Sequence, residues 1–83
     1  MTNDDSHVFE MPRVCTLTVT LRASRGALGR IASALSCMHV CALMYVAADT
    51  VWATAEIVVS PTDADRAYAR LNRIVDVLNV SAS

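Results

Sequence analysis

The sequence predicts a small α+β domain in which a strand, a helix, two strands, a second helix and a last strand follow one another. Apolar residues recur at every second position in residues 14–21 and again in 51–60, which is typical of strands buried on one face. They recur at intervals of three and four in residues 26–37 and 64–74, which is typical of amphipathic helices. These two periodicities, alternating along the chain, define the fold class.

Length and composition limit what this domain can be. The chain has 83 residues, of which 54% are hydrophobic and 18% charged. A chain of this length buries only about 60% of the surface that it exposes when unfolded. Part of its apolar surface is therefore expected to lie in an interface with another protein.

Charge and cysteine content exclude several classes of function. The net charge is −1, which does not favour binding to nucleic acid. No apolar run approaches the ~18–20 residues of a membrane span, and the first residues lack the pattern of a signal peptide. Three cysteines, an odd number, argue against a secreted disulfide framework. A cytoplasmic protein is expected.

The first half of the chain begins with residues 1–12, which are polar and aperiodic and are expected to form a flexible arm before a single domain at 13–83. In the strand at 14–21, one face is apolar, formed by Leu17, Val19 and Leu21, and the other carries Thr16, Thr18 and Thr20. After a loop at 22–25, a helix is expected from Gly26 to Cys37, with Ser24 as its N-cap. Its apolar stripe is formed by Leu28, Ile31, Ala32 and Leu35.

The second half begins with Val40–Ala48, which is apolar on both faces. A two-residue turn, Asp49-Thr50, joins it to the strand at 51–60, and the pair is interpreted as a hairpin. The second helix follows Pro61, capped by Thr62 or Asp63, with an apolar stripe formed by Ala64, Ala67, Tyr68, Leu71 and Ile74. The last strand is expected at 75–80.

The resulting order, βαββαβ, predicts a ferredoxin-like sandwich: a four-stranded antiparallel sheet with two helices on one face. Because Val40–Ala48 is apolar on both sides, we expect this strand to meet a partner at the edge of the sheet.

The turn between the first strand and the first helix is the candidate binding site. A helix start leaves backbone N–H groups without partners, and the helix dipole is positive there. Both features suit a carboxylate or a phosphate. Gly26 lies at this point and is expected to keep the site sterically open.

Catalytic and metal-binding patterns are weak. There is no P-loop, no phosphate-binding GxGxxG and no paired carboxylate in a predicted pocket. An acylphosphatase-like reaction on this topology needs an Asn on the sheet, whereas Asn72 and Asn79 both lie in the second half. Soft ligands in the segment Cys37-Met-His-Val-Cys41 suit copper or zinc, but free cysteines are more often small core residues. We expect no enzyme activity, metal or cofactor.

Three segments resemble one family. Residues 25–31 (Arg-Gly-Ala-Leu-Gly-Arg-Ile) are similar to its (P/S)-G-(A/V)-L-x-R-(V/I) motif, and residues 38–43 occupy the place of its R-G-Y-N-I-E-S-L. Residues 71–77 (Leu-Asn-Arg-Ile-Val-Asp-Val) are similar to its L-N-K-L-(I/V)-D-V. Over residues 13–82 the chain resembles the ACT domain, and within that family the small regulatory subunit of acetolactate synthase, in its short single-domain isozyme II form.

The resemblance implies a function without catalysis. Such a subunit binds and activates the thiamine-diphosphate-dependent catalytic subunit of acetolactate synthase in branched-chain amino-acid biosynthesis. It forms a homodimer through edge strands, and an amino-acid effector lies between the two ACT domains. The implied ligand-binding residues here are Ala23, Gly26, Ala27, Leu28, Cys41 and Ala42.

Two of those positions differ from the valine-sensitive members. Where these carry Asn side chains that hold the amino acid, the chain has Ala23 and Cys41. Losing a hydrogen bond to a charged group costs about 1.5–3 kcal/mol, so two losses weaken binding about 100-fold or more. Weak or absent valine binding is expected. A stand-alone ACT-domain sensor of another amino acid and a metal-binding ferredoxin-like module remain as alternatives.

Overall fold

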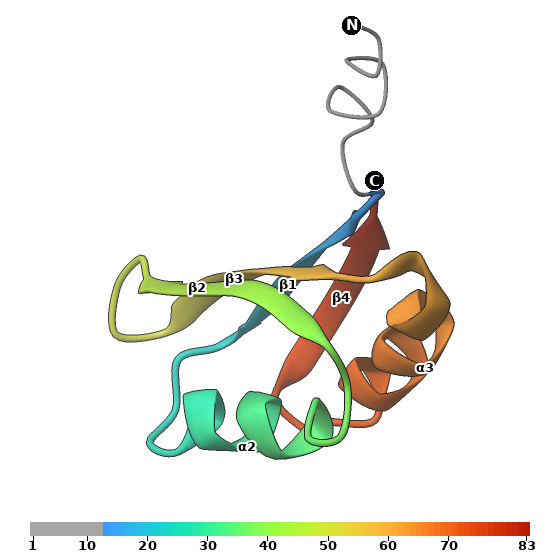
Figure 1. Cartoon of the computed structure of the whole chain (residues 1–83). Coiled ribbons are helices and arrows are strands. Elements are labelled where there is room, and N and C mark those ends of the chain that lie inside the picture. The colour runs from blue at the N-terminus through green and yellow to red at the C-terminus, as the bar shows by residue number, and fades with distance from the viewer. Residues whose placement is uncertain (1–12) are drawn as a thin grey trace, which may run out of the picture.

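The computed structural model describes residues 13–83, so the predicted arm at residues 1–12 lies outside the described residues. Its elements are β1 (Cys15–Arg22), α2 (Ala27–Ala34), β2 (Val40–Ala47), β3 (Trp52–Val59), α3 (Pro61–Asn72) and β4 (Val77–Ala82). The strands form one sheet in the order β2-β3-β1-β4, in which all neighbours are antiparallel. Both helices lie on the same face of this sheet (Figure 1). The predicted α+β class is confirmed, and the arrangement is compatible with a ferredoxin-like fold.

The core lies between the sheet and the two helices. Both predicted apolar faces are confirmed, since Leu17, Val19 and Leu21 of β1 are buried, as are all four residues of the β3 face, which are Ala53, Ala55, Ile57 and Val59. Ile31 of α2 and Leu71 of α3 are fully buried against them. Each such Leu or Ile side chain contributes about 1.5–3 kcal/mol on burial.

Helix α2 is shorter than predicted and uses a different face. It ends at Ala34, and the chain then turns through Cys37, whose φ of 72° lies in the left-handed region. The buried row is Ala27, Ile31 and Leu35, spaced four residues apart, whereas Leu28 is 44% exposed. The predicted stripe is therefore confirmed at Ile31 and Leu35 and wrong at Leu28 and Ala32, because the helix faces the sheet along its i, i+4 row.

Helix α3 is capped one residue before the proline. The hydroxyl of Ser60 accepts a hydrogen bond from the N–H of Thr62 at 3.1 Å, so the predicted caps Thr62 and Asp63 are wrong. Pro61 occupies the first helical position, where no N–H is needed. The carboxylate of Asp63 instead accepts from the backbone N–H of His39 at 3.0 Å and thereby joins α3 to the segment before β2.

The β2–β3 hairpin is confirmed, but its loop contains four residues, 48–51, rather than two. The carboxylate of Asp49 accepts from the N–H groups of Val51 and Trp52 at 2.7 and 2.8 Å and closes this loop. Both hydrogen bonds lower the pKa of Asp49, and the bond from the N–H of Trp52 has the larger effect.

Strand β4 begins at Val77, two residues later than predicted, and leaves Val75 94% exposed.

Within residues 13–83, no helix combines the length and the hydrophobicity that crossing a membrane requires.

Candidate functional site

The turn between β1 and α2 has the backbone conformation that only glycine adopts readily. Gly26 is the N-cap of α2 with φ 84° and ψ 0°, and no side chain caps the helix. A Cβ built at Gly26 meets no atom within 4 Å. The glycine is therefore needed for its positive φ. A Cβ there would extend into open space beside the helix start, so the expectation that Gly26 keeps this space free for a ligand stays a prediction.

The resemblance implies three ligand-binding residues at this helix start, Gly26, Ala27 and Leu28, and the backbone N–H of one of them is already engaged. The N–H of Ala27 donates to the carbonyl of Ser24 at 3.1 Å, so it is engaged within the turn. Within the part of the chain that the structure describes, the N–H groups of Gly26, Leu28 and Gly29 have no protein acceptor. The turn thus offers three backbone donors at the positive end of an eight-residue helix, with Gly29 in the place of Ala27.

Side chains from the first and second halves of the sequence hold this turn in place. The hydroxyl of Ser24 donates to Oδ2 of Asp76 at 2.8 Å, and Arg30 pairs with the same oxygen at 2.6 Å. The side chain of Asp76, the residue before β4, is 15% exposed, and that of Arg30 is 55% exposed. Sequence reasoning missed this cluster, although Arg30 and Asp76 lie in two of the motif-bearing segments.

Ala23 is the first residue after β1 and supports the turn through its backbone. Its N–H donates to the carbonyl of Val51 at 2.8 Å, which fixes it beside the β2–β3 loop. Its methyl group offers no hydrogen bond to a ligand.

The other two predicted ligand-binding residues lie elsewhere in the chain. Cys41 and Ala42 are in β2, and Ala42 pairs with Val58, which also pairs with Thr16. Thr16 lies six residues before Arg22, so the row of Ala42, Val58 and Thr16 is about 20 Å from the end of β1 that leads to Gly26. In addition, β2 is two strands away from β1 in the sheet, which adds about 10 Å across the strands. A single chain therefore does not bring Cys41 and Ala42 to the turn at Gly26.

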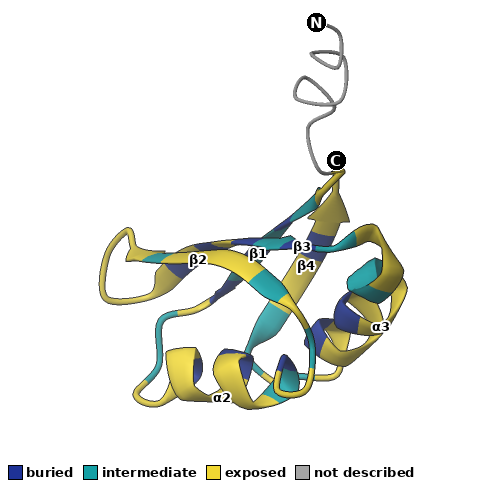
Figure 2. Cartoon of the chain, viewed as in Figure 1, coloured by how far each residue is buried: buried dark blue, intermediate teal, exposed yellow. Residues whose placement is uncertain are grey.

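Strand β2 is an edge strand with an exposed apolar surface. Leu43 is 39% exposed, Met44 59% and Val46 53%, and Figure 2 shows β2 mostly in the exposed colour. The pairing with β3 is interrupted between Val40 and Ala42, which leaves Cys41 as a bulge. Such an edge presents unpaired N–H and C=O groups beside apolar side chains and is suited to pairing with another strand.

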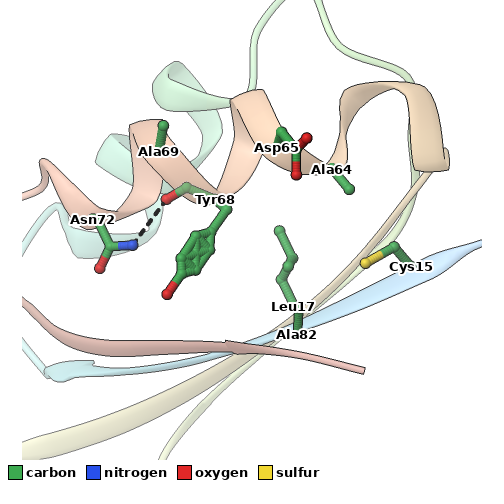
Figure 3. A pocket seen from close by; sticks show the side chains of 8 residues that line it. All are labelled: Cys15, Leu17, Ala64, Asp65, Tyr68, Ala69, Asn72 and Ala82. Atoms are coloured by element: carbon green, nitrogen blue, oxygen red, sulfur yellow. Dashed lines mark hydrogen bonds between the residues drawn. The ribbon is translucent and has the colours of Figure 1, made fainter.

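A groove lies away from the turn, between α3 and the ends of β1 and β4 (Figure 3). It has a volume of about 580 Å³ and a mostly apolar lining, formed by Cys15, Leu17, Ala64, Asp65, Tyr68, Ala69, Asn72 and Ala82. Tyr68, predicted as a core residue, is 38% exposed and lines this groove. No basic side chain of the lining pairs with Asp65 or activates Cys15, so its chemistry does not suggest a reaction.

The described residues also contain no group of three His, Cys, Asp or Glu side chains arranged to hold a metal ion. Cys37 and Cys41, which bound the segment weighed as a soft-metal site, are both exposed.

No protein-family model matches the chain, and no curated protein matches it significantly.

Proposed function

We propose that the chain is a cytoplasmic, homodimeric ACT-domain regulatory subunit that activates the catalytic subunit of an acetolactate synthase and has no reaction of its own. The observation that carries this proposal is the meeting of two motif-bearing segments at the β1–α2 turn. Arg30 from the first segment and Asp76 from the last share an ion pair, which holds the open helix start in position. The turn is thereby built as a small anion site rather than a catalytic centre.

The exposed edge of β2 supports the homodimer. Antiparallel pairing of two β2 strands joins the sheets of two copies into one eight-stranded sheet. Reversal of the strand carries Cys41 and Ala42 of the second copy toward the end of the sheet at which Gly26 lies. The two halves of the ligand-binding set, which are about 20 Å apart in one chain, then come from two copies.

The effector site is expected to bind valine weakly or not at all. Backbone donors of Gly26, Leu28 and Gly29 suit an amino-acid carboxylate, but Ala23 and Cys41 provide no amide side chain for its amino group. A valine-dependent rise in melting temperature at millimolar valine or below would contradict this part of the proposal.

Complex formation tests the proposal directly. The purified chain is mixed with the catalytic large subunit of acetolactate synthase and the mixture is separated by size-exclusion chromatography with light scattering. Co-elution at a fixed stoichiometry is expected. A chain that elutes alone at all tested concentrations would contradict the proposal.

The dimer edge is tested by a matched pair of substitutions. Leu43→Lys places a charge on the β2 edge, and Leu78→Lys places one on β4, the opposite edge. We expect Leu43→Lys to dissociate the homodimer and Leu78→Lys to leave it intact. The reverse result would assign the interface to β4 and overturn the β2 pairing.

A further inference from the structure

The helix-free face of the sheet is the second unpartnered surface of this molecule. Residues paired directly across neighbouring strands share a face, so the register defines its members. We call this surface the open face, and it is formed by Thr16, Thr18, Thr20 and Arg22 of β1, Trp52, Thr54, Glu56 and Val58 of β3, Ala42, Met44 and Val46 of β2, and Asn79 and Ser81 of β4. Neither helix covers it (Figure 1).

The open face combines apolar and hydroxyl side chains with only two charges. Trp52 is 40% exposed, and the guanidinium of Arg22 lies 6.0 Å from the centre of its ring. Glu56 is the other charged residue of this face, and together with Met44 and Val46 it borders a hollow of about 130 Å³. Exposed Trp and Arg side chains of this kind are enriched where interfaces gain most of their binding energy.

The two charges occupy different rows of the sheet. Arg22 pairs with Trp52, and Glu56 lies four residues farther along β3, at a distance of about 13 Å. They are too far apart to pair within one chain, and Glu56 has no ion pair among the described residues. The row of Thr20, Thr54 and Val46 lies midway between them.

We infer that the open face docks against the open face of a second copy of this chain. The two copies are related by a two-fold axis that lies between their sheets and runs across the strands, along the row of Thr20, Thr54 and Val46. This axis places the Arg22 row of each copy opposite the Glu56 row of the other. Two reciprocal Arg22–Glu56 pairs then form between copies, and Arg22 keeps its stacking on Trp52 because a guanidinium binds a carboxylate in its own plane. In this arrangement, Trp52 of each copy lies over Met44 and Glu56 of the other copy.

The area of the face indicates how strong this contact is. Four strands of about eight residues cover roughly 19 by 26 Å, or about 500 Å². A stable interface buries about 800 Å² per partner, so two single domains associate weakly by this face. A sheet doubled through its edge offers about 1,000 Å², which is sufficient. The stable form of this contact rests on the proposed edge pairing, which supplies the second half of the area, although the face and the edge are different surfaces and are tested by different substitutions.

Charge reversal tests the face contact. The number of chains per particle is measured by sedimentation over a range of concentrations, together with the fluorescence of Trp52, the single tryptophan of the chain. We expect Arg22→Glu and Glu56→Arg each to halve that number and to shift the Trp52 emission to longer wavelength. The combined variant restores the reciprocal pairs with their signs exchanged, so it is expected to recover the wild-type mass. Arg73→Glu, an exposed charge reversal on the helix side, serves as the control and is expected to change neither reading.

Each outcome decides the question. Single reversals that keep the wild-type mass, or a combined variant that does not recover it while its circular dichroism is native, would overturn the face contact. Dissociation by Leu43→Lys with unchanged behaviour of Arg22→Glu would support the edge pairing and refute the face contact. The reverse pattern would support the face contact and refute the edge pairing.

Discussion

Gly26 and Gly29 provide the sharpest prediction, because the same substitution at each is expected to have opposite effects. A Cβ at either position meets no atom within 4 Å, so packing does not differ between them. Backbone conformation does: Gly26 has φ 84° and Gly29 lies inside α2. Gly26→Ala and Gly29→Ala are therefore a matched pair that isolates the conformational term.

The magnitudes follow from the two conformations. An alanine forced into the left-handed region costs about 1–2 kcal/mol, so Gly26→Ala is expected to lower the free energy of unfolding by that amount. An alanine in an exposed helical position is favoured over glycine by about 0.5–1 kcal/mol, so Gly29→Ala is expected to raise it. At about 4–8 °C per kcal/mol for a domain of this size, the two melting temperatures diverge by at least about 6 °C.

Urea denaturation followed by circular dichroism and by Trp52 fluorescence measures both variants. All proteins are compared at one chain concentration, since the proposed dimer would make apparent stability depend on concentration. A Gly26→Ala variant as stable as the wild type would refute the left-handed turn, and with it the position of the backbone donors.

The other predictions concern carboxylates and a helix cap. Asp76→Asn is expected to lower the free energy of unfolding by about 1–2 kcal/mol through the ion pair with Arg30 and the bond from Ser24, and a double-mutant cycle with Arg30→Ala is expected to show coupling. Ser60→Ala is expected to cost about 1 kcal/mol in thermal denaturation by removing the α3 cap. The pKa values of Asp49 and Asp63 are lowered by backbone hydrogen bonds from Trp52 and His39, so their stabilisation is complete above the unfolded pKa of about 4 and is lost as the pH falls through the lower folded values. Asp49→Asn and Asp63→Asn are expected to flatten the acid limb of the stability curve, and an unchanged limb would contradict both assignments.

The strand faces could be predicted from the sequence because alternation is a local property. Leu17 to Leu21 and Ala53 to Val59 alternate without interruption, and both strands are buried on the predicted face. Helix ends were predicted less well, because Ser60, Thr62 and Asp63 are all competent caps. The choice among them depends on Pro61 taking the first helical position and on Asp63 bonding His39, a contact made across the fold.

The candidate site was predicted in part for the same reason. Gly26 before an apolar helical row is a local signal, and it placed the turn correctly. The bond that engages the N–H of Ala27 and the attachment of Ser24 to Asp76 depend on tertiary geometry, which no sequence period encodes. Cys41 lies at the far end of β2, so the ligand-binding role proposed for it requires a second chain.

The rate of pyruvate condensation tests the central claim most directly. The catalytic large subunit of acetolactate synthase is assayed alone, with the purified chain, and with the chain plus valine, and the Leu43→Lys variant serves as a matched control. We predict a higher rate with the chain, little change on adding valine, and reduced activation by Leu43→Lys. An unchanged rate at saturating concentrations of the chain would contradict the assignment as a regulatory subunit.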